Sequence, residues 1–243
     1  MIQKISRSEF LGNGPIKMLY PGKGIGKGDT GIGSIGRIDH PAFRGNTVIP
    51  MHPHSNDEIL SYFRTGKAEH KDSEGMEKTI GGKTLMLMKA GKVVFHEEKI
   101  NGQDELFEGL QIFIRPKKKD LVPEVKFLTL TELHSENVWR LIASPSDEST
   151  LQFSSSTWIY DTRLVKGSRI QLPTFENHLT MLIYTFQGEV NINKEVNLKK
   201  MDSLLVKDET VSIESIEDSE LVLFVTDERA EVFKEGMFSG NKF

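Results

Sequence analysis

The chain contains no cysteine among its 243 residues. This absence excludes disulfide bonds, a thiolate nucleophile and thiolate metal ligands. It also fits the reducing cytosol, where stable disulfides are rare. The chemistry of the protein must therefore depend on other side chains.

The sequence also lacks an excess of positive charge and long apolar runs. Lysine and arginine number 31 against 35 aspartate and glutamate residues, which gives a net charge of −4. Nucleic-acid binding needs a basic face, so we expect no direct nucleic-acid partner. No apolar run approaches the roughly 20 residues that span a membrane, and residues 1–5 lack the apolar core of a signal peptide. We therefore predict a cytoplasmic protein with no membrane partner.

Short apolar runs recur along the chain, bounded by glycine, proline or Lys-Asp. Such runs, rich in β-branched and aromatic residues, predict strands joined by turns. They are Glu58–Phe63, Thr84–Met88, Lys92–Phe95, Leu110–Ile114, Thr157–Val165, Thr180–Phe186, Ser203–Val206, Val211–Glu214 and Leu221–Val225. We expect short helices only near Thr129–Asn137 and Asp227–Lys234. Many short strands at even spacing predict an all-β sandwich or barrel.

The two halves of the chain resemble each other. Residues 59–66 (ILSYFRTG) align with residues 181–188 (MLIYTFQG), and the run that begins at Thr84 parallels the one that begins at Ser203. The shared order and nearly equal offset predict an internal duplication. We place the boundary after Pro123, because proline interrupts strand pairing. This gives an N-terminal domain of residues 1–123 and a C-terminal domain of residues 124–243.

Two pairs of side chains with i, i+2 spacing carry the candidate chemistry. His52 and His54 form the one His-x-His pair, and His96 and Glu98 repeat the spacing after an apolar run. Residues two apart lie on the same face of a strand, so each pair can face the interior together. Three imidazoles and one carboxylate on facing strands suit a divalent transition metal and leave positions open for a substrate.

Glu58 has the same strand parity as His52 and His54. It can be a ligand, or an acceptor that orients an imidazole, so the residues alone leave Glu58 and Glu98 both open as ligands. The ligand types alone do not rank the transition metals, because affinity order and cellular availability point in different directions. We expect one divalent ion, Fe(II) first, with Ni, Cu, Co, Mn or Zn as alternatives.

The remaining motifs receive simpler interpretations. We expect His70 to be a hydrogen-bonded side chain and His40 to lie at the surface. Residues 26–31 fit G-x-G-x-x-G, but a dinucleotide site needs a strand before the glycines and a helix after them. A strand is expected after them instead. The glycine-rich segment 22–33 is therefore interpreted as a loop that can cover the metal cavity.

The metal motifs resemble those of the pirin family. His52-Pro53-His54, followed by residues 57–62 (DEILSY) and 66–75 (GKAEHKDSEG), is similar to that family's first metal motif. Residues 88–91 (MKAG) with His96-Glu97-Glu98 are similar to the second. Residues 109–116 resemble the strand that closes the first cupin, and residues 141–145 the opening of the second. The resemblance covers most of the chain and is most specific over residues 48–123.

The resemblance implies a bicupin, an all-β fold of two double-stranded β-helix (jelly-roll) barrels packed face to face. It implies that His52, His54, His96 and Glu98 hold the metal, and so favours Glu98 over Glu58. Some pirin-like proteins are similar to quercetin 2,3-dioxygenases, which open the flavonol ring with O2. Others act as redox-sensitive binding proteins associated with transcription.

The C-terminal half lacks imidazoles at the corresponding positions. The offset of the repeat relates His52 and His54 to about Thr174 and Glu176. His96 and Glu98 fall near residues 215 and 217. We therefore expect no transition metal in this half, and a structural role that covers sheet faces and edges of its partner.

Two functions from different classes follow. The first is a metal-dependent dioxygenase of the quercetin 2,3-dioxygenase type, acting on a small aromatic, flavonol-like substrate. The ion would lower the pKa of a substrate hydroxyl, and Glu98 would accept its proton. The alternative is a non-catalytic metal-bound sensor or binding module that acts through a protein partner. A sugar isomerase is a third reading, but no basic cluster for a phosphate lies near the ligands. We expect a monomer.

Overall fold

The computed structural model describes residues 1–12, 14–20, 28–29, 31–103, 105–175 and 178–241. Within these residues the chain forms strands joined by turns and one short 3-10 helix, η1 (Arg7–Glu9). The predicted all-β class is confirmed. None of the described helices is long and apolar enough to cross a membrane.

Two sheets form the N-terminal barrel. The large sheet has six strands in the order β11-β8-β5-β10-β3-β2, and the small sheet has four in the order β4-β9-β6-β7. Buried apolar side chains between the two sheets, such as Phe63 and Met86, fill the barrel. The strands are β2 (Ile16–Tyr20), β3 (Ile35–Phe43), β4 (Thr47–His54), β5 (Glu58–Thr65), β6 (Lys67–Asp72), β7 (Glu77–Ile80), β8 (Thr84–Lys89), β9 (Val94–Asn101), β10 (Phe107–Ile114) and β11 (Glu124–Thr129).

The C-terminal barrel repeats this plan. Its large sheet has seven strands in the order β1-β19-β16-β21-β14-β12-β13, and its small sheet has the order β15-β20-β17-β18. Aliphatic side chains such as Ile183 and Leu223 fill it. The strands are β1 (Ile2–Ile5), β12 (Arg140–Ser144), β13 (Leu151–Gln152), β14 (Thr157–Leu164), β15 (Arg169–Gln171), β16 (Thr180–Gln187), β17 (Glu189–Ile192), β18 (Val196–Lys199), β19 (Ser203–Lys207), β20 (Ser212–Ser215) and β21 (Ser219–Thr226).

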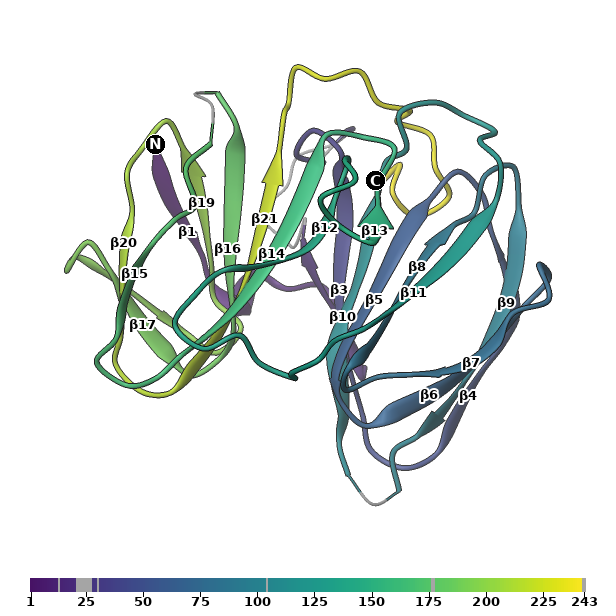
Figure 1. The fold of residues 1–243 in the computed structure, drawn as a ribbon, viewed down its shortest axis with the longest axis horizontal. Helices are drawn as coiled ribbons and strands as arrows, with labels where there is room; N and C mark the ends of the chain where they lie inside the picture. The colour runs from purple at the N-terminus through teal and green to yellow at the C-terminus, as the bar shows by residue number, and fades with distance from the viewer. Residues whose placement is uncertain (13, 21–27, 30, 104, 176–177, 242–243) are drawn as a thin grey trace.

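The two large sheets pack against each other, so the barrels lie side by side (Figure 1). The cluster between them draws on both halves, with Leu60 and Leu110 from one sheet and Leu182 and Phe224 from the other. A sheet with one face in its barrel and the other against its partner is buried on both faces, and β5 is accordingly buried at every residue except Thr65. The predicted arrangement of two packed cupin barrels is confirmed.

Each large sheet includes a strand from beyond the predicted boundary. Strand β11, which begins at Glu124, pairs antiparallel with β8 of the N-terminal barrel. Strand β1, at the start of the chain, pairs with β19 of the C-terminal barrel. The N-terminus therefore lies in the C-terminal half (Figure 1). The division after residue 123 stays a prediction.

The strands aligned by the internal repeat hold corresponding places. Strand β5 lies between β8 and β10, and β16 lies between β19 and β21. Each is followed by a glycine with positive φ, 70° at Gly66 and 84° at Gly188. A Cβ at Gly66 would lie 2.8 Å from the Cα of Phe107. Both the turn and the close approach of the next strand therefore require glycine.

Both predicted helices are wrong. The carbonyl of Leu133, in the segment Thr129–Asn137, accepts hydrogen bonds from Arg64 at 2.7 Å and Arg140 at 3.1 Å. Two arginine side chains thus donate to this carbonyl in place of the backbone N–H group that would do so in a helix. The segment Asp227–Lys234 forms one turn and then continues without regular structure. The loop expected over the metal cavity, residues 22–33, falls largely outside the described residues.

Replacing Phe224 tests the packing between the barrels. Its ring is fully buried between the large sheets, and truncation to alanine would leave a cavity there. We expect Phe224→Ala to lower the free energy of unfolding by about 3–5 kcal/mol, measured by urea titration. The control Val122→Ala, at a side chain 84% exposed, should change it by less than about 0.5 kcal/mol. Equal effects of the two changes would show that the interface contributes little.

Candidate metal centre

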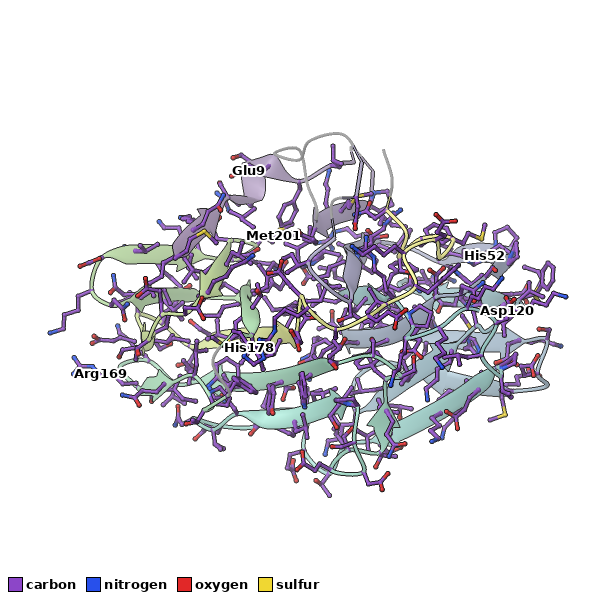
Figure 2. All side chains as sticks on the ribbon, turned by 90° about the horizontal axis from the view of Figure 1, so that it is seen from above. Glu9, His52, Asp120, Arg169, His178 and Met201 are labelled. Carbon is purple, nitrogen blue, oxygen red and sulfur yellow. The ribbon has the colours of Figure 1, made fainter. Side chains whose placement is uncertain are left out.

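Strand pairing brings three histidines to one face of the small N-terminal sheet. His52 and His54 lie two residues apart on β4, and His96 on β9 is directly opposite His52. His52 is half-buried, whereas His54 and His96 are 2% and 1% exposed. The site lies near one end of the molecule, and Arg169 of the C-terminal barrel lies near the other (Figure 2).

The imidazoles converge through their Nε2 atoms. The Nε2 atom of His52 lies 3.2 Å from that of His54 and 3.1 Å from that of His96. Adjacent ligands that each bind one ion at about 2.1 Å lie about 3 Å apart when their bonds are perpendicular. The distances from His52 Nε2 to the other two nitrogens therefore fit ligands that share one transition-metal ion.

The protonation of these rings also fits a metal. The Nδ1 atom of His52 lies 2.9 Å from the carbonyl oxygen of Pro50. A carbonyl only accepts, so Nδ1 carries the proton and Nε2 presents a lone pair. Burial lowers the pKa of His96 to about 2, helped by the nearby His54, His52 and His70. His96 is therefore neutral at physiological pH, which is the form that binds metals.

Glu98 lies beside this cluster, two residues after His96. Its side chain is 2% exposed, and Oε1 lies 3.9 Å from His96 Nδ1 without a hydrogen-bond partner among the described residues. Burial raises the pKa of Glu98 to about 7. Possible ligand atoms of Glu98, His70 and His96 lie within 4.8 Å of one another. Those of His52, His54 and His96 form a second group of the same kind. A direct bond from Glu98 to the ion stays a prediction.

His70 also lies at this site, although its sequence context predicted no functional role for it. It is fully buried on β6, opposite Glu98 in the strand register. Its Nε2 atom lies 2.7 Å from Asp72 Oδ2, which confirms the expected hydrogen bond. The His70-x-Asp72 spacing, the same i, i+2 pattern as in the other pairs, is the signal that could have revealed its place.

Glu58, the alternative ligand, points elsewhere. Its carboxylate accepts from the backbone N–H of Ser154 at 2.9 and 3.2 Å, and neither group of possible ligand atoms includes it. The buried Glu58 carboxylate therefore connects β5 to the C-terminal half.

The expected surface position of His40 is wrong. It is 1% exposed, its Nδ1 is hydrogen-bonded to the Tyr184 hydroxyl, and its Nε2 lies 3.0 Å from Glu108 Oε1.

The correspondence expected between the halves is wrong in detail. Ser215 pairs with Val190. Val190 lies two residues after Gly188, the glycine that follows β16. In the N-terminal barrel Ile100 holds this place, paired with Ala68. Ser215 therefore corresponds to Ile100 and not to His96. Ile100 follows its partner Ala68 by 32 residues, whereas Ser215 follows its partner Val190 by 25. A constant offset therefore cannot align the two barrels.

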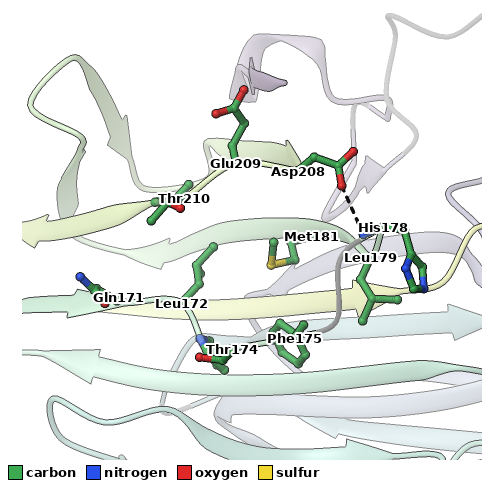
Figure 3. A pocket seen from close by; sticks show the side chains of 12 residues that line it. Gln171, Leu172, Thr174, Phe175, His178, Leu179, Met181, Asp208, Glu209 and Thr210 are labelled. Carbon is green, nitrogen blue, oxygen red and sulfur yellow. Dashed lines mark hydrogen bonds between the residues drawn. The ribbon is translucent and has the colours of Figure 1, made fainter.

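The corrected register puts aliphatic residues in place of part of the polar site. Glu98 opposite His70 corresponds to Ile213 opposite Ile192, and both isoleucines are fully buried. A cavity of about 720 Å³ opens nearby in the C-terminal barrel, lined partly by apolar side chains such as Phe175 (Figure 3). Thr174, expected to match His52, also lines it, and Glu176 lies outside the described residues.

Comparisons with known proteins agree with this architecture. The Pirin family model matches residues 36–114, and the quercetinase C-terminal cupin domain matches residues 141–225. A pirin-like protein of Caulobacter vibrioides is 30% identical over 192 residues, covering 73% of this chain and 77% of the relative. The quercetin 2,3-dioxygenase of Escherichia coli is 27% identical over 196 residues, covering 80% and 83%.

The solved structures extend the likeness to the whole fold. The crystal structure of bacterial pirin YhhW from Escherichia coli, in complex with nickel(II), matches with a TM-score of 0.80 at 23% identity. The match covers 93% of this chain and 99% of that one. Two packed cupin barrels, with a histidine cluster in the first, define a bicupin. Together with the relatives and family matches, they show that the chain belongs to the pirin family.

Replacing Glu98 with glutamine tests its burial in metal-free protein. Folding raises its pKa from 4.5 to about 7, so the folded state binds the proton more tightly. This stabilisation is fully present below pH 4.5 and is lost as the pH rises through 7. Urea unfolding with chelator should show Glu98→Gln close to wild type at pH 4.5 but more stable by about 3 kcal/mol at pH 8. A difference that does not change with pH would contradict this burial.

Proposed function

We propose that this protein is a metal-dependent dioxygenase of the quercetin 2,3-dioxygenase type. The observation that carries the proposal is the convergence of the Nε2 atoms of His52, His54 and His96 beside the buried carboxyl of Glu98. In this proposal the three histidines hold one divalent ion, and Glu98 is the fourth ligand and the catalytic proton acceptor. Relatives that carry the name quercetin 2,3-dioxygenase support the reaction type.

The donor set supports the choice of ion. Neutral imidazoles and a carboxylate suit Fe(II), Ni, Cu, Co, Mn or Zn alike, and we propose Fe(II) as the first ion to test. The nickel(II) in the related bacterial pirin supports nickel as an alternative. When bound, the ion would supply an open coordination position and lower the pKa of a hydroxyl placed there.

The protein's own side chains would complete the reaction site. The buried carboxyl of Glu98 would accept the proton of a substrate hydroxyl whose own pKa the ion lowers. The aromatic rings of Phe113 and Phe238 lie 5.9 and 4.9 Å from the ring of His54. Phe113 is buried, whereas Phe238 is partly exposed and offers an aromatic face beside the site, which supports a small aromatic substrate of the flavonol class.

One observation favours the alternative, a metal-bound sensor or binding module. Strands β4 and β9, which carry the histidines, expose apolar side chains at Val48, Met51 and Phe95, which are 56%, 47% and 44% exposed. Exposed apolar surface beside a site is typical of contacts with a partner protein. Stoichiometric metal without turnover of quercetin would favour this function over the dioxygenase.

The role of Glu98 is tested by the change Glu98→Ala. Loss of a general base lowers the rate by about 10²–10⁴-fold, so we expect quercetin turnover to fall by that range while some metal is retained. The assay follows loss of flavonol absorbance with iron- or nickel-loaded protein. The control is Glu97→Ala, because Glu97 alternates to the other face of β9 and lies 3.6 Å from Lys99. Undiminished turnover by Glu98→Ala would refute the assignment.

A further inference from the structure

The last segment of the chain leaves the C-terminal barrel and returns to the N-terminal one. Strand β21 ends at Thr226, and the yellow trace then crosses to the other half (Figure 1). On the way the N–H of Phe233 donates to the carbonyl of Pro116 at 2.8 Å. Residues 236–241, here called the C-terminal strap, contact the N-terminal barrel.

A buried arginine fixes the strap. Arg115, which follows β10 and has no exposed surface, donates from Nε to the carbonyl of Ser239 at 2.9 Å and from Nη2 to that of Gly240 at 3.3 Å. The side-chain amide of Asn241 donates to the carbonyl of Gly36 at 2.7 Å. The strap is therefore packed into the barrel and is not a loose tail.

The strap also binds the buried carboxylate of Asp57, between β4 and β5. This carboxylate accepts from the N–H of Phe238 at 3.1 and 3.2 Å and from the N–H of Ser239 at 2.8 Å. A Cβ on Gly236 would lie 2.4 Å from the carbonyl oxygen of Asn56 and 2.6 Å from Asp57 Oδ1. Glycine at position 236 thus allows the close approach that these bonds require.

The same carboxylate faces one of the three histidines. Asp57 Oδ2 lies 3.5 Å from His54 Nδ1, an atom that makes no hydrogen bond in the described part of the chain. In metal sites a carboxylate beside the free nitrogen of a histidine fixes the tautomer and orientation of the ring. With Nδ1 toward Asp57, His54 presents Nε2 to the other two rings.

The ring of Phe238 covers His54 from the strap side. Its centroid is 4.9 Å from that of His54 and 5.2 Å from that of Phe113, on which it is stacked. The guanidinium of Arg37 lies 5.3 Å from the Phe238 centroid and 5.7 Å from that of Phe113, within the range of cation–π contact with both rings. The stacked pair of Phe113 and Phe238 thus packs against the His54 ring and limits its freedom to turn.

We propose that the C-terminal strap is a positioning element of the metal centre, which is therefore assembled from both halves of the chain. Asp57, held by the strap's N–H groups, orients His54, and Phe238 closes the site over that ring. The C-terminal half then has a role beyond support, because it delivers the strap. This inference rests on the proposed metal site at His52, His54 and His96.

Two substitutions in the full chain test the proposal. Loss of such a supporting partner weakens metal binding by about 10–100-fold, so Phe238→Ala and Asp57→Asn should each raise the dissociation constant for Co(II) at least about tenfold. Both should also alter the Co(II) d–d absorption bands. The control Met237→Ala, at a side chain 53% exposed, should change neither. Affinity is measured by competition with a chelating dye, after circular dichroism has verified the fold.

The outcomes separate the two proposals. If wild type binds Co(II) and both variants bind it equally well, the strap does not position the site, and this inference fails alone. If wild type binds no Co(II), the proposed metal site itself fails.

A second measurement needs no variant, so it holds even if the substitutions unfold the protein. Coupling between two sites is reciprocal, so an ion at the histidines must stabilise the strap if the strap stabilises the ion. Saturation with Zn(II) should slow amide hydrogen exchange at Phe238 and Ser239 several-fold, and leave the amides of β18 (Val196–Lys199) unchanged. Unaltered exchange at Phe238 and Ser239 would overturn the inference.

Discussion

The packing of the two large sheets is the contact on which the rest of the structure depends. Each sheet buries one face in its own barrel and the other against its partner. The chain passes from one large sheet to the other between β1 and β2, and passes back between β11 and β12. The same packing places the end of the chain where residues 236–241 can reach Asp57.

The metal site combines rigid strands with unfavourable local electrostatics. Burial keeps His96 neutral and keeps Glu98 protonated up to about pH 7, and several of the buried polar atoms have no hydrogen-bond partner among the described residues. Buried imidazole nitrogens and a buried carboxyl oxygen without partners destabilise the metal-free protein. In the proposed function, a divalent ion bound at the converging Nε2 atoms would offset part of this cost.

Much of this arrangement could be predicted from local sequence patterns. The i, i+2 spacing of His52 and His54, and of His96 and Glu98, places each pair on one strand face, and the register then set two histidines opposite each other. The place of Glu98 beside His70, and the burial of His40, could not be predicted. They depend on which strands become neighbours, and local spacing carries no information about that.

The failed predictions share a physical cause, which is contact between distant segments. The segment after β11 has helical character in its sequence, but Arg64 and Arg140 bind its carbonyl groups instead. The correspondence between the halves shifted because the barrels differ in length between equivalent paired positions, and a single offset cannot describe such a difference. The strap contacts Arg115 and Asp57, which lie 124 or more positions earlier in the chain, a separation at which sequence patterns predict no contact.

The proposed metal centre requires that His52, His54 and His96 of the first barrel hold one metal ion. The most direct test is elemental analysis of the protein purified without chelator, beside the double variant His52→Ala, His96→Ala. Wild type should contain about one equivalent of a single transition metal, and the double variant should lose it while remaining folded, because removal of two of three imidazoles leaves too few ligands. Wild type that binds no metal after reconstitution with Fe(II), Ni(II) or Co(II), or a double variant with undiminished metal, would contradict the account.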